Sequence, residues 1–569
     1  MDKSSYIGNA DPNAIDYLYK QYQNDPESVD IGWKKFFEGF EFAQTNFETT
    51  SDIPENFQKE FKVLNLISGY RTRGHLFTKT NPVRERRKYK PDLSIENYGL
   101  SETDLNSVFQ AGEEVNIGAA TLKTIIEHLE LTYCQSIGIE FMYLRGPERM
   151  EWIRNKIEIK NRPVFDKKRK LKLFETLIKA HGFESFLGKK FVGQKRFSIE
   201  GGESLIPALE TLVSKGSDLG VENFIMGMAH RGRLNTLTNV FKKRPKDIFA
   251  EFEGKEFDFE TTFDGDVKYH QGFTSKVTLD NGKEIGLTLA PNPSHLEAVN
   301  GVVEGIARAK IDHIYQDEKK VCPVLIHGDA AIAGQGIVYE TIQMAELNGY
   351  RTGGTIHIVV NNQVGFTTNY LDGRSSTYCT DIAKTTRCPV FHVNGDDVEA
   401  VLTAIEIAVE YRQIFHRDVF IDLLCYRKYG HNEGDEPKFT QPKLYNLIAK
   451  HPNPKDIYFS HLQEIGILNK EEAKKIERTY SEFLETEFDL SHKSEKALVH
   501  DFLAEIWEGY RHCNGKDFDK SPSTNVAAKT LQALGKKLSS LPQGNKYYRK
   551  IEKIFNERLK AFSDNTLDW

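Results

Sequence analysis

Two polar residues, each at the end of an apolar run, are the residues of this chain whose types and spacing could do chemistry. Asp329 ends the run 324–327, and Asn362 ends the run 356–360. A carboxylate, an amide carbonyl and a nearby backbone carbonyl are hard oxygen ligands that suit Mg²⁺, which also takes oxygens from a diphosphate. The pair therefore indicates a site for magnesium and a diphosphate group.

The elements that must position this pair are two strands and the helix between them. Both apolar runs are typical of buried parallel strands, and residues 336–350 place Val338, Ile342 and Ala345 at helical spacing. A strand, a crossover helix and a second strand bring the carboxyl ends of neighbouring strands to one edge of the sheet. Open α/β sheets bind their ligands at that edge.

Other interpretations of the pair remain open from the residues alone. Asp329 could cap the following helix, and Asn361-Asn362 could form a turn. Gly-Asp occurs four times in the chain, so one occurrence at this spacing is weak evidence. Small residues favour the phosphate interpretation because they let backbone amides approach it; they are Gly328, Ala330, Gly334 and Gly336. A dinucleotide site is a weaker alternative, since Gly334-Gln335-Gly336 lacks the third glycine at the expected offset.

Composition describes an ordinary globular chain of 569 residues with a net charge of −6. That charge gives no general electrostatic reason to bind nucleic acid or an anionic membrane. The six cysteines are scattered and show no Cys-x-x-Cys spacing, which favours free thiols in a reducing cytosol over disulfides or zinc ligands. No apolar run of 18 residues and no charged-then-apolar amino-terminal segment is present. We therefore expect the protein to be located in the cytoplasm.

Four regions follow from the changes of pattern along the chain. We expect a helical docking arm at 1–45, a helical region at 46–190, an α/β domain at 191–450 and a helical region at 451–569. Short β-rich runs alternate with helical ones in the third region, as in a doubly wound, mostly parallel α/β fold. Further strand candidates are 224–228, 390–393 and 419–424, and Asp396-Asp397 is expected to cap a helix that ends at Phe415. Residues 41–56 are polar and are expected to be a linker.

Several longer motifs then resemble one family closely. In chain order they are Glu200-Gly201-Gly202-Glu203-Ser204, His230-Arg231-Gly232-Arg233-Leu234-Asn235, Lys268-Tyr269-His270, Asn292-Pro293-Ser294-His295-Leu296, His327-Gly328-Asp329-Ala330-Ala331, Asn361-Asn362-Gln363-Val364-Gly365-Phe366 and Tyr429-Gly430-His431-Asn432-Glu433. The chain resembles the thiamine-diphosphate-dependent first component of 2-oxoglutarate dehydrogenase over its whole length. The resemblance implies a transketolase-like first domain that binds thiamine diphosphate.

The resemblance also implies a reaction and partners. In this family the cofactor carbanion attacks the 2-oxo carbon of 2-oxoglutarate, carbon dioxide leaves, and the succinyl group passes to a lipoyl arm of the acyltransferase component. The thiazolium supplies the electron sink, and the protein supplies binding and orientation. Dihydrolipoyl dehydrogenase completes the complex, which serves the tricarboxylic acid cycle, and the full-length enzyme is a homodimer.

Site residues carry over position by position from the family's motifs. Asp329, Asn362 and the carbonyl of Val364 would hold Mg²⁺. The expected cofactor-binding residues are Arg231, Leu296, Asp329, Ala330, Ala331, Asn362 and His431. The expected substrate-binding residues are His230, His270 and Ser294, with His230 and His270 as the catalytic pair. Imidazoles can hold the carboxylates of a dianionic substrate without a permanent buried charge.

Two segments keep more than one interpretation. Residues 71–75 (Arg-Thr-Arg-Gly-His) could contact an anion near the site or form a solvated turn. His295 could position its neighbours rather than touch the substrate.

The chain also departs from the family, whose members continue into a second α/β domain with the glutamate that activates the cofactor. We expect a fragment, a truncated product or one half of a split enzyme, inactive by itself. A non-catalytic cofactor-binding or docking module is the alternative from another class. A decarboxylase for 2-oxoadipate is the alternative within the enzyme class, because one methylene changes binding by only about 1–3 kcal/mol.

Overall fold

The computed structural model describes residues 12–46, 55–84, 88–160, 164–255, 267–498, 502–511 and 513–566. The chain divides into two compact units. The first comprises residues 1–259 and 264–504, and the second comprises 260–263 and 505–569. No described helix is both long and apolar enough to cross a lipid bilayer.

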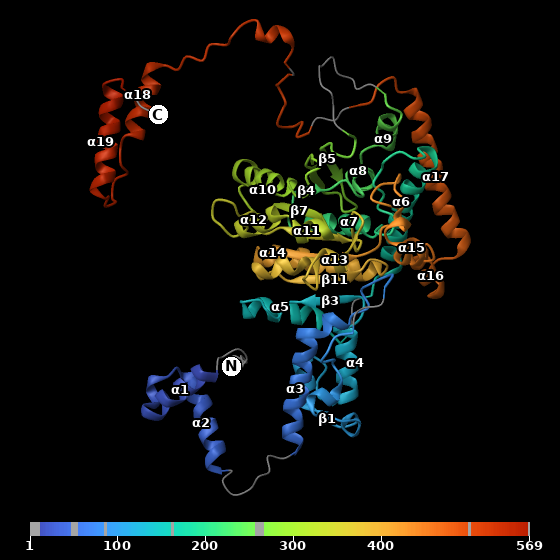
Figure 1. The fold of residues 1–569 in the computed structure, drawn as a ribbon, viewed down its shortest axis with the longest axis vertical. Coiled ribbons are helices and arrows are strands. Elements are labelled where there is room, and N and C mark those ends of the chain that lie inside the picture. Colours follow the sequence, from blue (N-terminus) through green and yellow to red (C-terminus); the bar gives the residue numbers. More distant parts are fainter. Residues whose placement is uncertain are drawn as a thin grey trace. The chain divides into compact units, whose positions relative to one another are not determined.

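An eight-stranded sheet forms the centre of the first unit (Figure 1). Its strand order is β3-β11-β12-β8-β7-β4-β6-β5. The six inner strands run parallel, while β3 and β5 pair antiparallel at the two edges. The strands are β3 (Ile137–Glu140), β4 (Asn223–Met228), β5 (Phe273–Thr278), β6 (Glu284–Leu289), β7 (Val321–Gly328), β8 (Ile356–Asn361), β11 (Val390–Asn394) and β12 (Val419–Leu424). The expected α/β, mostly parallel fold is confirmed.

Helices cover both faces of this sheet, and the period-2 alternation of the strands decides which residues face which helix. Leu325 of β7 packs with Val303 of α10 (Val299–Lys310), whereas its neighbour Ile326 belongs to the core beneath α7 (Leu205–Asp218) and α14 (Val398–Phe415). Val359 of β8 packs with Val338 of α12 (Gly336–Met344) on the α10 face. Strands buried on both faces explain the continuous apolar runs of the sequence.

The strands predicted from the sequence are all present. β7 and β8 are parallel neighbours, with Val324 opposite Ile356, so Asp329 and Asn362 follow adjacent strands at the same edge. The crossover helix α12 is shorter than the predicted 336–350, because residues 346–350 form a turn in which the Tyr350 amide donates to Leu347. Asp397 caps α14 as predicted, accepting from the amide of Ala400.

Residues 55–190 contribute α3 (Glu55–Arg73), α4 (Leu122–Tyr133), α5 (Pro147–Ile157) and α6 (Lys167–Lys190). Between α4 and α5 the chain forms β3, which the sequence analysis did not predict. Four residues, one of them glycine, are too short for a clear strand pattern. Short elements in this part are η2 (Gly74–Phe77), η3 (Ile95–Tyr98), η4 (Glu102–Asp104), β1 (Val108–Phe109), η5 (Gln110–Val115) and β2 (Ala120–Thr121).

The amino-terminal arm contains the two predicted helices, α1 (Pro12–Asn24) and α2 (Ile31–Asn46), with η1 (Pro26–Ser28) between them. They pack through aromatic rings: Phe37 lies 5.1 Å from Tyr19, 5.3 Å from Tyr22 and 5.5 Å from Trp33, measured between ring centroids. The predicted linker at 41–56 is wrong over 41–46, which α2 continues, and over 55–56, where α3 begins. Residues 47–54 of that linker lie outside the described residues.

The remaining elements either join the strands or follow the sheet. Those that join strands are α8 (Arg233–Asn239), α9 (Pro245–Phe252), the π-helical turn η6 (Ile311–Tyr315), α11 (Asp329–Gly334), β9 (Val364–Gly365), β10 (Thr368–Asn369), α13 (Tyr370–Gly373) and η7 (Cys379–Thr385). Those that follow it are η8 (Pro437–Phe439), α15 (Pro442–Ile448), α16 (Pro454–Glu464) and α17 (Lys470–Lys493). The second unit holds η9 (Gly515–Phe518), α18 (Ala528–Leu538) and α19 (Arg549–Ser563).

Candidate active site

A cleft opens where the carboxyl ends of β4, β7 and β8 meet the loop after β12. Each strand contributes the residue at its end or just beyond it, as open α/β sheets do at a ligand site. The cleft is lined by Met228, Ala229, His230, Arg231, Leu296, Ile326, His327, Gly328, Asp329, Ala330, Ala331, Val360, Asn362, Val364, Gly365, Phe366, Arg427 and His431.

Most of the residues predicted to form the site line this one cleft. They are His230, Arg231, Leu296, Asp329, Ala330, Ala331, Asn362, Val364 and His431. His270 and Ser294 are not among its lining residues. They form a pair of their own, with Ser294 Oγ 3.4 Å from Nε2 of His270. The structure thus gathers the predicted metal and cofactor positions with one of the predicted histidines, His230.

Asp329 offers a buried oxygen to a cation. The residue is 2% exposed, and its Oδ2 has no hydrogen-bond partner among the described residues. Its nearest cation is Arg374, whose Nη1 lies 3.6 Å away. Burial raises the pKa of this carboxyl to about 6, with Asp422 adding to the shift and Arg374 opposing it. No side chain caps α11, so the helix-cap interpretation of Asp329 does not hold in the structure.

Asn362 lies in the turn that directly follows β8. Its Oδ1 accepts a long hydrogen bond of 3.4 Å from the amide of Val364, and Asn361 accepts from Gln363 at 3.2 Å. The turn interpretation therefore describes the Asn361 side chain. Asn362 keeps the second lone pair of its side-chain carbonyl, and a metal ligand needs such a lone pair.

Two guanidinium groups give the cleft a site for an anion. Arg231 donates to the carbonyls of Ser198 at 3.0 Å and His431 at 2.7 Å. Arg427 donates to the carbonyls of Tyr429 at 3.1 Å and Phe366 at 3.0 Å. Among the described residues, neither Arg231 nor Arg427 forms an ion pair with a carboxylate. Burial and the nearby Arg427 lower the pKa of Arg231 to about 10, and Glu433 opposes the shift only in part.

Small residues line part of the cleft. A Cβ atom at Gly328, one of its lining residues, would meet no atom within 4 Å, and the same holds for Gly334 and Gly336, which are exposed and outside the lining. Gly365, by contrast, packs directly on Ala330, where a Cβ would come within 2.6 Å of the Ala330 methyl group. The close approach of these two segments forms a shallow cradle between Asp329 and Asn362.

His230 is a neutral imidazole at the wall of the cleft. Its ring lies 4.0 Å from Phe197 and 5.8 Å from His431, measured between centroids. Burial lowers the pKa of His230 to about 3, and the positive charges of Arg231, His431 and His270 add to the shift. An uncharged ring can donate one hydrogen bond to an anionic ligand and does not repel the arginine beside it.

Sequence reasoning missed Arg427, Phe366 and His327. Arg427 lies three residues beyond the end of β12, whereas Asp329 and Asn362 directly follow β7 and β8, so the strand-end rule gave a weaker signal for it. Phe366 had no such signal, because the turn after β8 decides its position. His327 was regarded only as part of a strand.

The segment 71–75, left open above, makes internal contacts. Arg71 donates to both carboxylate oxygens of Glu158, at 2.7 and 2.9 Å, and both side chains are buried. Nδ1 of His75 lies 2.8 Å from the hydroxyl of Tyr378. These groups join α3 to α5 and to η7. His295 is exposed, while its neighbour Leu296 lines the cleft.

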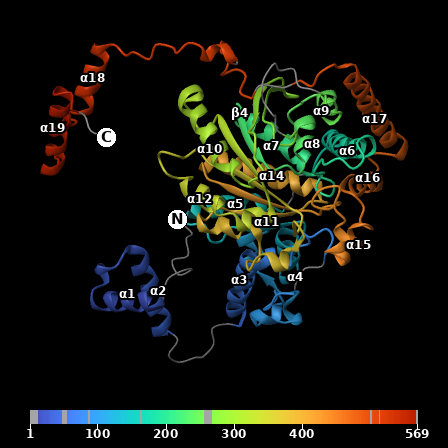
Figure 2. The same cartoon turned by 45° about the horizontal axis from the view of Figure 1, so that its top comes forward.

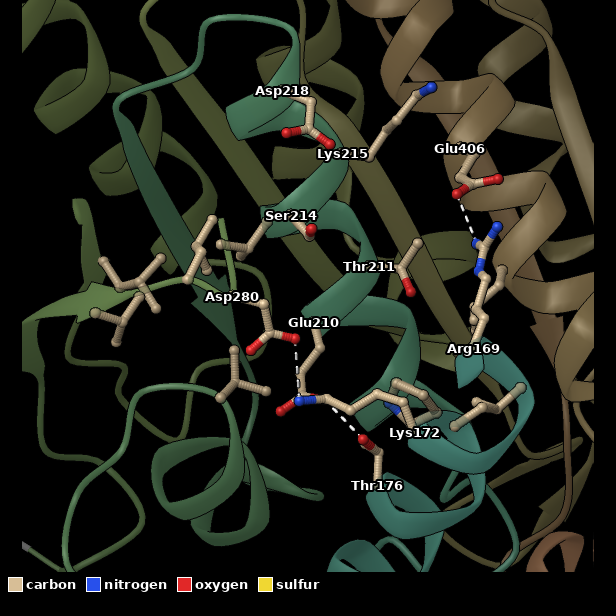
Figure 3. A pocket seen from close by; sticks show the side chains of 18 of the residues that line it. Arg169, Lys172, Thr176, Glu210, Thr211, Ser214, Lys215, Asp218, Asp280 and Glu406 are labelled. Atoms are coloured by element: carbon tan, nitrogen blue, oxygen red, sulfur yellow. Dashed lines mark hydrogen bonds and ion pairs between the residues drawn. The ribbon is translucent and has the colours of Figure 1, made fainter. Parts of the chain in front are cut away.

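A separate hollow lies between α6, α7 and the β5–β6 hairpin (Figure 3). Its charged groups pair with one another. Arg169 lies 2.6 Å from Glu406, Thr176 donates to Glu210 at 2.8 Å, and Lys172 lies 3.4 Å from Asp280. Ion pairs that already satisfy one another give little reason to bind a charged ligand, so the cleft at the strand ends is the stronger candidate site.

Comparison with known proteins shows which families and curated proteins this chain is similar to. Residues 176–499 match the family described as "Dehydrogenase E1 component", and residues 4–44 match "2-oxoglutarate dehydrogenase N-terminus". Similar curated proteins are the 2-oxoglutarate dehydrogenase E1 components of Azotobacter vinelandii, 42% identical over 98% of this chain, and of Haemophilus influenzae, 38% identical over its whole length. The component of Brucella anthropi is 38% identical over 99% of the chain. The chain spans 62–63% of the length of these relatives.

Proposed function

Because the chain belongs to the dehydrogenase E1 component family, we propose that it forms the part of a 2-oxoglutarate dehydrogenase that binds the diphosphate end of thiamine diphosphate with Mg²⁺. One observation carries the proposal: among the described residues, the cleft holds a buried carboxylate oxygen without a hydrogen-bond partner and two guanidinium groups that form no ion pair with a carboxylate. A diphosphate bridged to a divalent cation complements both.

Each predicted residue has a task in this proposal. Asp329, Asn362 and the carbonyl of Val364 hold Mg²⁺. Arg231, with Arg427 added from the structure, neutralises the diphosphate, and His431 offers its carbonyl to Arg231. The remaining cofactor contacts come from Leu296, Ala330 and Ala331. Bound thiamine diphosphate supplies the electron sink for decarboxylation of a 2-oxo acid.

The proposed substrate is 2-oxoglutarate. His230 faces the cleft as a neutral hydrogen-bond donor, and a dianion needs such donors more than it needs another buried charge. His270 and Ser294 stay in the proposal as a second substrate contact, supported by the effect of His270 on the pKa of His230.

We further propose that the succinyl group passes to the lipoyl arm of an acyltransferase, in a complex with dihydrolipoyl dehydrogenase and in the tricarboxylic acid cycle. The match of residues 4–44 to a 2-oxoglutarate dehydrogenase amino terminus supports a docking role for the arm at 1–45. The boundaries at 45, 190 and 450 and the homodimer belong to the same proposal. A cytoplasmic location is proposed because all six cysteines are free thiols, five of them buried.

Release of labelled carbon dioxide from 2-oxoglutarate tests the proposal. The chain is combined with a polypeptide that carries the remaining length of its relatives, at saturating thiamine diphosphate and Mg²⁺, with 2-oxoadipate as a parallel substrate. We expect release that requires both polypeptides and a larger kcat/KM for 2-oxoglutarate. No release from the pairing would refute the enzyme proposal, and a larger kcat/KM for 2-oxoadipate would refute the substrate.

A further inference from the structure

A second cavity lies between α10 and α12. These two helices are labelled in Figure 2. The volume of the cavity is about 460 Å³, and it shares no lining residue with the cleft. It is lined by Gly301, Glu304, Gly305, Arg308, Ala309, Asp312, His313, Thr341, Ile342, Met344, Ala345, Gly349, Tyr350, Thr355, His357 and Asp418.

His357 presents an unsatisfied nitrogen to this cavity. The residue is 1% exposed, and its Nε2 has no hydrogen-bond partner among the described residues. The nearest carboxylate oxygen, Oδ2 of Asp418, is 3.6 Å away, which is too far for a hydrogen bond. Phe420 stacks on the imidazole with 4.0 Å between centroids and holds the ring in place. Leaving a buried polar atom unpaired is costly, so the atom points to a missing partner.

The hydrogen bonds behind His357 indicate what that nitrogen offers. Burial would raise the pKa of the Glu297 carboxyl, but His327 and Asn300 bring it below the usual value, so its Oε atoms carry no proton. Glu297 therefore accepts from Nδ1 of His327 at 2.6 Å, and Nε2 of His327 faces Nδ1 of His357 at 3.0 Å. Nδ1 of His357 is thus engaged with His327, and Nε2 is the ring nitrogen left for a ligand.

Two carboxyl groups complete the floor of the cavity. Glu304 accepts from the hydroxyls of Thr355 at 2.7 Å and Thr352 at 2.9 Å, and Asp418 accepts from the Thr355 amide at 2.8 Å. Burial and the charge of Asp418 raise the pKa of Glu304 to about 7. In the part of the chain that the structure describes, no lysine or arginine forms an ion pair with Glu304 or Asp418.

The arginines around the cavity are engaged elsewhere. Arg308 binds Asp312 at 2.9 Å and two backbone carbonyls, and the guanidinium of Arg412, behind the floor, binds the carbonyls of Gly354, Glu318, Val321 and Thr352 and the side chain of Gln413. The floor therefore presents acceptors and negative charge toward the cavity.

The walls of the cavity are small and apolar. A Cβ atom at Gly301, Gly305 or Gly349 would meet nothing within 4 Å, so these glycines leave open space. Ile342, Ala345 and Tyr350 supply apolar surface on the α12 side. An apolar body of several carbon atoms fits these walls.

We propose that this cavity binds a small organic cation, an ammonium or amidinium group on an apolar body, whose head donates hydrogen bonds to His357 Nε2, Glu304 and Asp418. The acceptors on the floor bind the charged head group, and the open space beside the glycines holds the apolar part of the ligand. The proposal does not depend on the cofactor proposed for the cleft.

Binding of benzamidine to the purified full chain tests the proposal, with benzamide as the neutral compound of the same shape. Isothermal titration and saturation-transfer NMR measure the two affinities without any assay of activity. We expect benzamidine to bind at least about tenfold more tightly than benzamide, the ratio expected for one charge-assisted hydrogen bond. Equal affinity of the two compounds, or no binding of benzamidine, overturns the proposal.

Three variants locate the site. Glu304→Gln keeps the side chain's shape and removes its charge, and Gly305→Leu fills the cavity without changing charge. Both should weaken benzamidine binding about tenfold or more, whereas Glu340→Gln, an exposed position on α12 outside the cavity, should leave it unchanged. Circular dichroism confirms folding of each variant. Unchanged affinity in Gly305→Leu, or equal loss in Glu340→Gln, would place benzamidine elsewhere and contradict the assignment.

Discussion

At the scale of single residues, the buried carboxyl groups divide by whether a basic partner meets them. Glu140 lies between His392 at 2.9 Å and Lys384, which together hold its pKa at about 2 against the effect of burial. Glu158 accepts hydrogen bonds from the Arg71 guanidinium on both carboxylate oxygens. Asp329 meets a basic group only at 3.6 Å (Arg374), Glu304 has no ion pair among the described residues, and burial raises the pKa of both. Each of these two carboxyls lines a cavity, which is where a ligand can supply further positive charge.

Replacing Asp329 tests the metal assignment. Asp329→Ala removes the carboxylate oxygen that has no partner, so Mg²⁺-dependent binding of thiamine diphosphate should be lost. Titration of the cofactor with and without Mg²⁺, followed by calorimetry, measures the effect. Asp280→Ala, at an exposed acid far from the cleft, serves as the control and should bind as the wild type does. Unchanged cofactor affinity in Asp329→Ala would remove Asp329 from the proposed site.

Replacing Glu304 tests whether the pKa of its carboxyl is raised, because a raised pKa makes the free energy of unfolding depend on pH. Its folded-state pKa of about 7 exceeds the ordinary 4.5, so the folded chain holds a proton that the unfolded chain releases between these values. The stability that this proton contributes is fully present below pH 4.5 and is lost as pH rises to about 7. Glu304→Gln should therefore be more stable than the wild type at pH 8, by about 2–3 kcal/mol, and much closer to it at pH 5. Urea unfolding at both pH values measures this; an equal difference at both would contradict the raised pKa.

At the scale of elements, glycine has opposite effects in two helices on opposite faces of the sheet. Gly305 lies inside α10, where an added Cβ would meet open space. Gly216 lies inside α7, where a Cβ would come within 2.7 Å of the Phe224 ring. Both positions are helical, so the difference between them comes from packing and not from propensity.

This contrast predicts opposite mutational effects. Gly305→Ala should stabilise the chain by about 0.5–1 kcal/mol, because alanine loses less backbone entropy in a helix and meets no obstacle. Gly216→Ala should destabilise it by about 1–3 kcal/mol, because the Phe224 ring must move. Chemical denaturation of the two variants under one set of conditions measures both. The same sign for both changes would show that packing at α7 does not control the outcome.

At the scale of the whole molecule, the chain consists of two units with separate interiors. In the second unit only Gly535 and Ser539 are buried among the described residues, and apolar side chains such as Leu538 remain exposed. In the first unit, α17 packs against α6 and α9, and its Glu487 binds Arg244 at 2.6 Å. Residues up to α17 therefore belong to the cooperative core.

Two truncations test this division. A chain that ends at Ala504 should keep the thermal midpoint of the main transition within about 2–4 °C, since it loses almost no buried contact of the first unit. A chain that ends at Leu468 loses α17 and the Arg244 ion pair, and its midpoint should fall by well over that amount. Differential scanning calorimetry records both. A large fall for the first truncation would mean that the two units unfold together.

The sequence by itself determined five of the eight strands of the sheet, their parallel order around Asp329 and Asn362, and the family, because apolar periodicity and contiguous motifs are local properties of the chain. Nine of the predicted site residues follow from those motifs and line one cleft. Only the tertiary structure decided that Arg427 joins the cleft, that His270 and Ser294 lie outside its lining, and that Glu304, His357 and Asp418 surround a second cavity. Those three residues are more than fifty positions apart along the chain. Their meeting depends on the strand order β12-β8-β7-β4 and on the helix above it, which no local pattern contains.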